Sequence, residues 1–267
     1  MLSYQHSYHA GSLADVHKHA ILSVLLAKLV EKNKPLTYIE THAGRGIYDL
    51  ASNEAKKTGE AKEGILKLLE LSTTFSDTHP YWHVIRLVQS HYGKNCYPGS
   101  PLLAKNLLRT GDQIHLMELH PQEYLALKKN LHSENIHIHK RDGYEGVLAL
   151  SPPKNRRGLV FIDPSYEIKS EYKEVATFVL SLRKKWAEAI ILIWYPILDT
   201  KNHIAMCNIL KNSSLSKFWQ QEIIFSSHQK NKMQGSGLIC IHLPYRLENA
   251  LSEIKNWFTS IKKQPAR

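Results

Sequence analysis

The stretch Leu159-Val160-Phe161-Ile162-Asp163-Pro164-Ser165-Tyr166 decides the fold and places a candidate site within it. Its first four residues are apolar without alternation, which is typical of a strand buried on both faces of a parallel sheet. Pro164 follows an acid, and because proline has no N–H to donate, it takes the chain out of the sheet. The stretch therefore predicts a buried strand that ends in an acid, a turn and an aromatic ring. Open α/β sheets bind their ligands at this edge.

This turn suits the exocyclic amine of a nucleobase. The Asp163 carboxylate and the Pro164 carbonyl offer two acceptors for the two hydrogens of such an amine. The ring of Tyr166 suits stacking on a base taken out of its helix. Asp-Pro-Ser is also a common turn in which the acid acts as a cap, and this stretch alone leaves both interpretations open.

Composition narrows the class of protein. The 267 residues, 43% of them hydrophobic, suit one large α/β domain or a domain with an insertion. The net charge of +11 favours a polyanionic partner, nucleic acid before membrane, over a basic surface without a partner. The scattered Cys96, Cys207 and Cys240 fit a reducing cytoplasm. No signal peptide or membrane span is expected.

Acids recur at the predicted strand ends. Strands are expected at 36–40, 114–118 and 136–140, besides the one that ends at Asp163. The acids at or just beyond these ends are Glu40, Glu118, Asp142 and Asp163. Together with the glycine-bearing loop after the first strand, they predict a site for a nucleoside-bearing ligand. The loop falls short of the full dinucleotide fingerprint, so a nucleotide-dependent oxidoreductase is the least favoured class.

A helical insertion is predicted between the first two strands. Glu118 lies much farther past the glycine-bearing loop than the roughly 20 residues of an ordinary βαβ unit. Residues 50–96 are basic and helical in pattern, which predicts an insertion subdomain there and a main domain of residues 1–49 and 97–267. A packing element or lid and a positively charged wall for nucleic acid remain equal alternatives for this insertion.

Ser100 stands before Pro101, an arrangement typical of a helix N-cap followed by proline at the first helical position.

The last third of the chain is expected to add strands to the sheet. They are predicted at 189–195, closed by Pro196, and at 222–225 and 237–243, with a basic loop at 230–237. A metal site built from the N-terminal histidines is disfavoured, since no set of carboxylates or cysteines accompanies them.

Several motifs together resemble one family. They are Tyr4-x-His6-x-x-His9-Ala10-Gly11-x-x-Ala14-Asp15-x-x-Lys18-His19, Thr41-His42-Ala43-Gly44, Tyr97-Pro98-Gly99-Ser100-Pro101, Glu118-Leu119-His120-Pro121, Asp163-Pro164-Ser165-Tyr166 and Trp194-Tyr195-Pro196. This set is similar to the bacterial 23S ribosomal RNA adenine-2030 N6-methyltransferases, the large-subunit methyltransferase J family. The resemblance implies a Rossmann-like S-adenosylmethionine-dependent methyltransferase sheet with a small helical insertion subdomain.

The resemblance also implies residue roles. The residues implied to hold S-adenosylmethionine are His19, His42, Ser100, Glu118, Asp142 and Gly143, with Lys18 close by. Glu118 would take the ribose hydroxyls and Asp142 the adenine amine. Asp163 and Pro164 would polarise the target amine, Tyr166 would stack on the base, and Tyr4 would contact the substrate. The family's second turn proline is Ser165 here, which implies a slightly looser turn rather than an inactive enzyme.

The resemblance implies 23S ribosomal RNA as partner, and we expect that RNA to be protein-free or in an early assembly state. A monomer is the default expectation, the cysteine pattern fits the cytoplasm, and the expected reaction needs no metal. Two other classes stay open. A DNA adenine-N6 methyltransferase would share the Asp163 turn, and methyl transfer to RNA and to DNA would discriminate between them. A non-catalytic RNA-binding protein would bind RNA but not S-adenosylmethionine.

Overall fold

The computed structural model describes residues 5–71, 78–213, 215–225 and 233–262. The chain divides into two compact units. The sheet unit comprises residues 33–45 and 109–243, and the helical unit comprises residues 5–32, 46–108 and the segment from 244 onward. Of the sequence-based predictions, Tyr4 and residues 230–232 of the basic loop lie outside the described residues.

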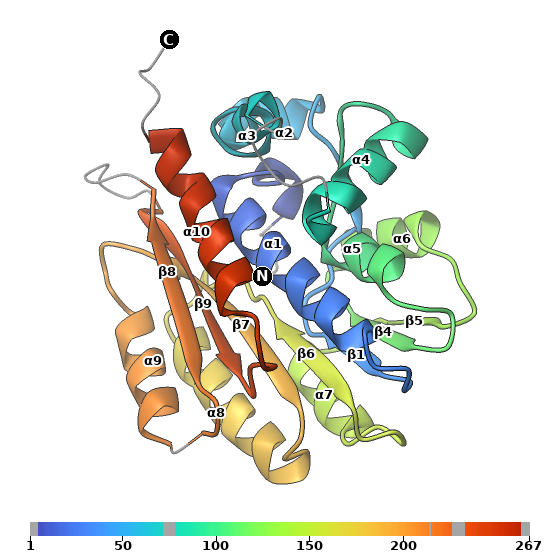
Figure 1. The fold of residues 1–267 in the computed structure, drawn as a ribbon, viewed down its shortest axis with the longest axis vertical. Helices are drawn as coiled ribbons and strands as arrows, with labels where there is room; N and C mark the ends of the chain where they lie inside the picture. The colour runs from blue at the N-terminus through green and yellow to red at the C-terminus, as the bar shows by residue number, and fades with distance from the viewer. Residues whose placement is uncertain (1–4, 72–77, 214, 226–232, 263–267) are drawn as a thin grey trace. The chain divides into compact units, whose positions relative to one another are not determined.

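The sheet unit is built on a seven-stranded sheet with the order β5-β4-β1-β6-β7-β9-β8 (Figure 1). In this order the strands are Ile136–His139, Gln113–Met117, Thr37–Glu40, Gly158–Ile162, Ile190–Ile197, Gly235–Ile241 and Trp219–Ile224. Neighbours from β5 to β7 run parallel, whereas β9 is antiparallel to both of its neighbours. Every residue of β1 and β6 is buried, as the apolar run at 159–162 predicted. This is the Rossmann-like sheet that the sequence predicted.

Among its described residues, the sheet unit has four helices. They are α6 (Pro121–Asn130), α7 (Gly143–Leu150), α8 (Glu171–Lys185) and α9 (His203–Asn212). Helices α7, α8 and α9 lie side by side along one face of the sheet, and α6 packs against β5 (Figure 1). Because strand and helix alternate, the carboxyl ends of β1, β4, β5, β6 and β7 point the same way, and the loops that follow them share one edge.

Strand β7 runs past the proline that was expected to close it. Pro196 and Ile197 remain in the strand and pair with Ser236 and Gly235 of β9. On the other side, pairing with β6 stops at Ile193. Beyond that point no strand of the described residues pairs with this edge of β7, so a proline that lacks an N–H is tolerated there. The prediction that Pro196 ends the strand was therefore wrong.

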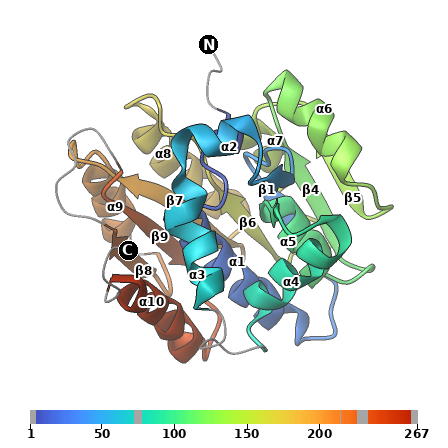
Figure 2. The same cartoon turned by 90° about the horizontal axis from the view of Figure 1, so that it is seen from above.

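The helical unit is arranged around α1 (Leu13–Val30). Most of α1 is buried because apolar residues occur around nearly its whole circumference. The other elements are η1 (His6–Tyr8), β2 (Ile47–Asp49), α2 (Asn53–Thr58), η2 (Lys62–Leu66), α3 (Lys67–Glu70), α4 (Pro80–Tyr92), β3 (Cys96–Pro98), α5 (Ser100–Leu107) and α10 (Glu248–Lys262). Helix α10 packs against α1 and α3 (Figure 2).

The predicted insertion, residues 50–96, lies within this helical unit and is helical through α2, η2, α3 and α4. The compact unit is larger than the insertion, because it also takes in α1, α5 and α10. The antiparallel pair β2–β3 flanks the insertion and was not predicted. The main-chain nitrogen of Ile65 donates to the carbonyl of Gly11 at 2.8 Å, which joins the insertion to the N-terminal segment.

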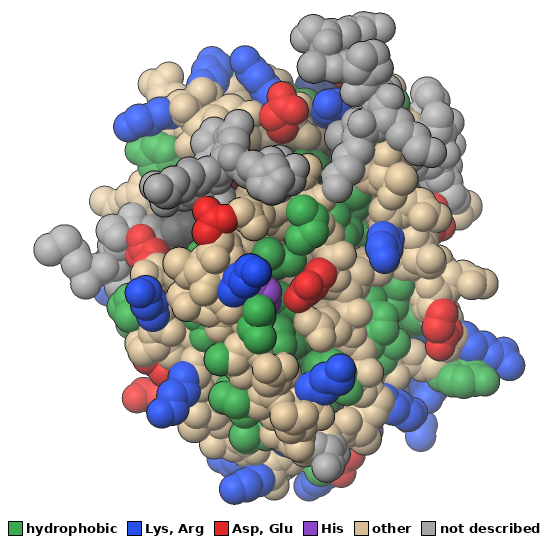
Figure 3. Space-filling model, turned by 90° about the vertical axis from the view of Figure 1, so that its left-hand side faces the viewer, with side chains coloured by type: hydrophobic (Ala, Val, Ile, Leu, Met, Phe, Trp, Pro, Cys, Tyr) green, Lys and Arg blue, Asp and Glu red, His purple; other side chains and the backbone are tan. Residues whose placement is uncertain are grey.

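Within the described part of the chain, none of the helices has the length and apolar character needed to cross a membrane. On the face drawn in Figure 3, lysine and arginine side chains are dispersed among acidic and apolar ones.

Candidate active site

The Asp163 turn follows β6 directly, since Ile162 is the last residue of that strand. Pro164 is buried, while Asp163 is partly exposed. The carboxylate of Asp163 lies near His42, which follows β1, and raises the pKa of that imidazole. Burial has the larger and opposite effect and lowers the pKa of His42 to about 4. His42 is therefore a neutral imidazole at pH 7, beside the predicted catalytic carboxylate.

Tyr166 is held tightly in the same turn. Its backbone is left-handed, with φ 54°, a conformation that costs a bulky side chain roughly 1 kcal/mol or more. The hydroxyl donates to the main-chain carbonyl of Trp194 at 2.8 Å. The ring lies 4.4 Å from the ring of Tyr172, centroid to centroid. Tyr166 is 6% exposed, and the ring of Tyr172 covers one of its faces. Stacking on a target base would use the other face and stays a prediction.

Glu118 reaches the loop after β1 from the end of β4. One carboxylate oxygen accepts from the main-chain nitrogen of Gly44 at 2.8 Å, and the other from that of His120 at 2.7 Å. Gly44 has φ 61°, which a side chain would strain. Burial raises the pKa of Glu118, and these two hydrogen bonds partly offset the rise. Each carboxylate oxygen can still accept a second hydrogen bond, so the pair could accept from both hydroxyls of a ribose diol.

Asp142 and Gly143 join the end of β5 to α7. Asp142 is the N-cap of α7, and its side chain accepts from the main-chain nitrogen of Glu145 at 2.9 Å. A Cβ on Gly143 would stand 2.1 Å from the carbonyl oxygen of Thr41. Glycine is therefore required for α7 to start so close to the end of β1.

Tyr144 was overlooked in the sequence. Its ring lies 5.6 Å from that of His42, edge to face. Its hydroxyl is buried and has no hydrogen-bond partner in the structure as described. An unpartnered hydroxyl beside the loops of Glu118 and His42 is consistent with a site that receives a polar ligand. Its position directly after Asp142-Gly143 was the signal that could have identified it.

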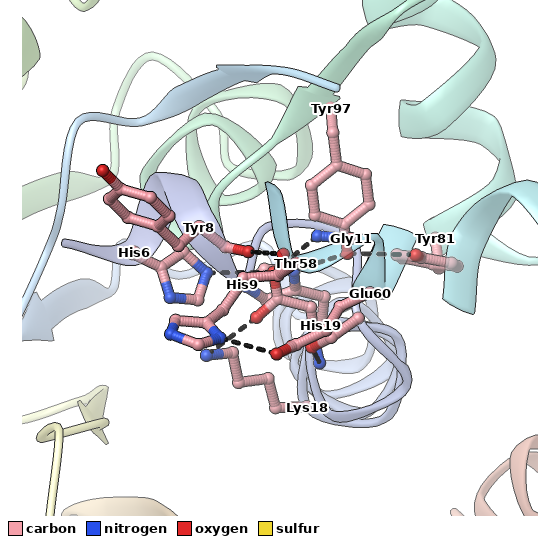
Figure 4. A network of polar contacts seen from close by, with 12 residues as sticks. His6, Tyr8, His9, Gly11, Lys18, His19, Thr58, Glu60, Tyr81 and Tyr97 are labelled. Atoms are coloured by element: carbon pink, nitrogen blue, oxygen red, sulfur yellow. Dashed lines mark hydrogen bonds and ion pairs between the residues drawn. The ribbon is translucent and has the colours of Figure 1, made fainter. Parts of the chain in front are cut away.

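Lys18, His19 and Ser100 belong to the helical unit. Lys18 and His19 take part in a polar network of that unit (Figure 4). Asp15 is 1% exposed and pairs with Lys18 at 3.0 Å and with His6 at 2.9 Å. It also accepts from the main-chain nitrogen of Gly11 at 2.9 Å. Burial raises the pKa of Asp15, but the charges of His6 and Lys18 outweigh burial and hold the pKa well below its ordinary value. Lys18 is thus a buried side chain that pairs with a buried carboxylate.

His19 continues this network. Its Nδ1 atom lies 2.9 Å from the hydroxyl of Tyr97, which lies 3.2 Å from the hydroxyl of Tyr81 (Figure 4). Burial lowers the pKa of His19 to about 3, so the ring is neutral. Ser100 is the first residue of α5, whose N-cap is Gly99. The capping interpretation of Ser100 was therefore wrong.

The sheet unit thus carries His42, Glu118, Asp142, Gly143 and the Asp163 turn on loops after the carboxyl ends of neighbouring strands. The helical unit carries Lys18, His19 and Ser100. Three features together define a Rossmann-like S-adenosylmethionine-dependent methyltransferase. They are the antiparallel β9 next to parallel strands, the hydrogen bond from the glycine-bearing loop to Glu118, and the Asp-Pro-x-Tyr turn.

Comparison with known proteins gives the family. A family model described as "RsmJ: Ribosomal RNA large subunit methyltransferase D, RlmJ" matches residues 33–266. The ribosomal RNA large subunit methyltransferase J of Escherichia coli is 36% identical over 97% of this chain and 94% of its own length. That of Haemophilus influenzae is 38% identical over 97% of this chain and 93% of its own length. The chain belongs to the ribosomal RNA large subunit methyltransferase J family.

A solved structure has the same fold as this chain. The crystal structure of a protein from Legionella pneumophila is 37% identical to this chain, with a TM-score of 0.86. The match covers 95% of this chain and 94% of the other. The resemblance drawn from the sequence motifs is confirmed, and with it the enzyme class.

Proposed function

We propose that this protein methylates N6 of one adenine, at position 2030, in 23S ribosomal RNA. The observation that carries the proposal is the Asp163-Pro164 turn at the end of β6, with the carboxylate beside His42. The relatives are named as methyltransferases of the large-subunit ribosomal RNA. A net charge of +11 is compatible with an RNA substrate.

The residues of the sheet unit suit the methyl donor. Glu118, fixed by the main chain of Gly44 and His120, would accept from the ribose hydroxyls. His42 and Gly143 would line the same site, and the Asp142 oxygen not used to cap α7 would accept from the adenine amine. Bound S-adenosylmethionine supplies a methyl group on a cationic sulfur, and the C–S bonding pair returns to sulfur as the new N–C bond forms.

The Asp163 turn would act on the target amine. The carboxylate of Asp163 and the carbonyl of Pro164 would accept its two hydrogens, hold the nitrogen near the methyl group and localise its lone pair. The nitrogen gains positive charge in the transition state, where a nearby carboxylate stabilises it most. The extra proton then leaves the nitrogen for Asp163 or water. Tyr166 would support the base from the same turn.

The roles of the other predicted residues remain proposals. Lys18, His19 and Ser100 of the helical unit are proposed to bind the cofactor, and Tyr4 is proposed to contact the RNA, as the family resemblance implies. We also propose that the enzyme works as a cytoplasmic monomer on RNA that is protein-free or early in assembly.

The substrate test compares three acceptors with the wild-type protein and labelled S-adenosylmethionine. They are 23S ribosomal RNA stripped of protein, assembled large subunits and adenine-containing duplex DNA. We expect N6-methyladenine at position 2030 of the stripped RNA and little label in DNA. Label in DNA alone would replace the proposal with a DNA methyltransferase, and cofactor-independent RNA binding without transfer would replace it with a non-catalytic RNA-binding protein.

A further inference from the structure

The loop that follows the Asp163 turn presents one large apolar side chain to solvent. Residues 167–170 are all exposed, and Ile168 is 63% exposed. Ile168 is two residues from Tyr166, so their Cα atoms are at most about 7 Å apart. The exposed isoleucine therefore stands next to the residue proposed to support the target base.

The backbone of Ile168 is fixed although its side chain is exposed. Its main-chain nitrogen donates to the Glu171 carboxylate at 3.4 Å, and its carbonyl accepts from the main-chain nitrogen of Glu171 at 3.0 Å. Glu171 is the first residue of α8, so this reciprocal pair ties the loop to the start of a helix.

The two ends of the loop are also joined. Tyr166 precedes the loop and Tyr172 follows it, and both are buried, with ring centroids 4.4 Å apart. The hydroxyl of Tyr166 is bound to the Trp194 carbonyl at 2.8 Å. Since both ends are packed and the backbone is bonded, the loop holds the main chain of Ile168 in one place while its side chain stays exposed.

We propose that Ile168 is a wedge that fills the gap left in the RNA stack when the target adenine is drawn out toward Asp163. An extruded base leaves two unstacked neighbours, and an apolar side chain inserted between them covers apolar surface that water would otherwise contact. The hydrogen-bonded loop favours this role, because its backbone loses little conformational entropy when the side chain inserts. The inference rests on the proposed function, since it assumes that an adenine is extruded.

Single exposed apolar residues are common on proteins, so the test needs a matched control. Leu125 on α6 is 66% exposed, close to the value for Ile168, and α6 packs against β5 at the edge of the sheet. Leu125→Ala therefore removes a similar exposed side chain from another part of the same unit. Ile168→Met serves as the conservative variant that keeps apolar bulk.

The experiment uses the full chain and an RNA fragment that the wild type methylates. Single-turnover rates and RNA dissociation constants are measured for each variant with this fragment. Base extrusion is followed separately, by the fluorescence of a second fragment in which 2-aminopurine replaces the target adenine. We expect Ile168→Ala to bind RNA within about twofold of wild type, to lose about tenfold or more in methylation rate and to show a smaller fluorescence rise. Ile168→Met and Leu125→Ala should both remain near wild type.

The outcomes separate this inference from the proposed function. If the wild type methylates no adenine of the RNA, the proposed function fails and the wedge with it. If the wild type methylates the RNA and Ile168→Ala keeps the wild-type rate or the full fluorescence rise, only the wedge is overturned. An equal loss in Leu125→Ala would overturn it as well, because the effect would then not be particular to this loop.

Discussion

The carboxylate of Glu118, at the end of β4, accepts a hydrogen bond of 2.8 Å from the main-chain nitrogen of Gly44 in the loop after β1. This contact joins the two loops on which the proposed cofactor site of the sheet unit depends. Because its other oxygen accepts from His120 at 2.7 Å, the carboxylate is fixed in one orientation before any ligand binds.

Substitution of Glu118 should weaken binding of S-adenosylmethionine. Glu118→Ala removes the acceptors for the ribose hydroxyls, and Glu118→Gln places an amide donor against one of the two main-chain N–H groups. We expect both to raise the dissociation constant by about tenfold or more, as measured by calorimetry. Glu134→Ala, at an exposed acid in the same unit, is the control. Unchanged cofactor affinity in the Glu118 variants would contradict the assignment.

Gly143→Ala should destabilise the sheet unit. The new Cβ would stand 2.1 Å from the carbonyl oxygen of Thr41, so the start of α7 or the end of β1 must shift. We expect a loss of roughly 1–3 kcal/mol in the free energy of unfolding, measured by urea titration. Gly111→Ala is the matched control, because its Cβ would meet nothing within 4 Å. Equal free energies of unfolding in the two variants would show that the close approach of Gly143 to Thr41 does not limit the stability of the unit.

Asp15→Asn should destabilise the helical unit. Asp15 and Lys18 are 1% and 3% exposed, and Asp15→Asn removes the carboxylate charge that pairs with the buried Lys18. Such a change costs about 3–5 kcal/mol, to be measured in chemical denaturation. Glu31→Gln disrupts the exposed Lys28–Glu31 pair near the end of α1 and should cost about 0–1 kcal/mol. Comparable losses in the two variants would show that burial of the Asp15 pair has no special effect.

Acid should destabilise the protein through a histidine cluster on β4 and β5. The ring of His115 lies 4.7 Å from that of His137 and 5.5 Å from that of His139. Burial, followed by repulsion from these two rings, lowers the pKa of His115 from 6.5 to about 4. Between these pH values the unfolded chain binds more protons than the folded one. The stabilisation is therefore complete above pH 6.5 and is lost as the pH falls toward 4.

The test of this effect is the melting temperature across that pH range. His115→Gln should show a smaller fall in melting temperature than wild type, since it removes one group that must be protonated on unfolding. His132→Gln, at an exposed histidine of the same unit, should follow the wild-type curve. A His115→Gln curve parallel to that of wild type would contradict the proposed cause.

Much of the sheet could be predicted because its strands are short apolar runs with acids at their ends. The run at 159–162 appears in β6, and Glu118 and Asp142 lie just beyond β4 and β5 as expected. The strands β2 and β3 have three residues each and no clear alternation, so the sequence carried no signal for them. Pro196 was misread because pairing on one side of β7 ends before it, which only the sheet order reveals.

The site residues that belong to a sequence motif could be predicted. The contacts that hold them in place could not, because those contacts depend on tertiary packing. The acids and the Asp163 turn follow from strand ends. The anchoring of Tyr166 by the Trp194 carbonyl and the Tyr172 ring depends on contacts between separate elements. The same holds for Asp15, whose partners Lys18 and His6 look like surface residues in the sequence but are tied to a buried carboxylate.

The most direct test of the account is methyl transfer from labelled S-adenosylmethionine to protein-free 23S ribosomal RNA by wild type, Asp163→Asn and Asp163→Ala side by side. Loss of a group that stabilises charge in the transition state should lower the rate of Asp163→Ala by about 100-fold or more. Asp163→Asn should retain more activity, because its amide oxygen still accepts a hydrogen bond. Cofactor affinity should stay near wild type in both variants. Near-wild-type rates in both would contradict the role of Asp163 and the mechanism built on it.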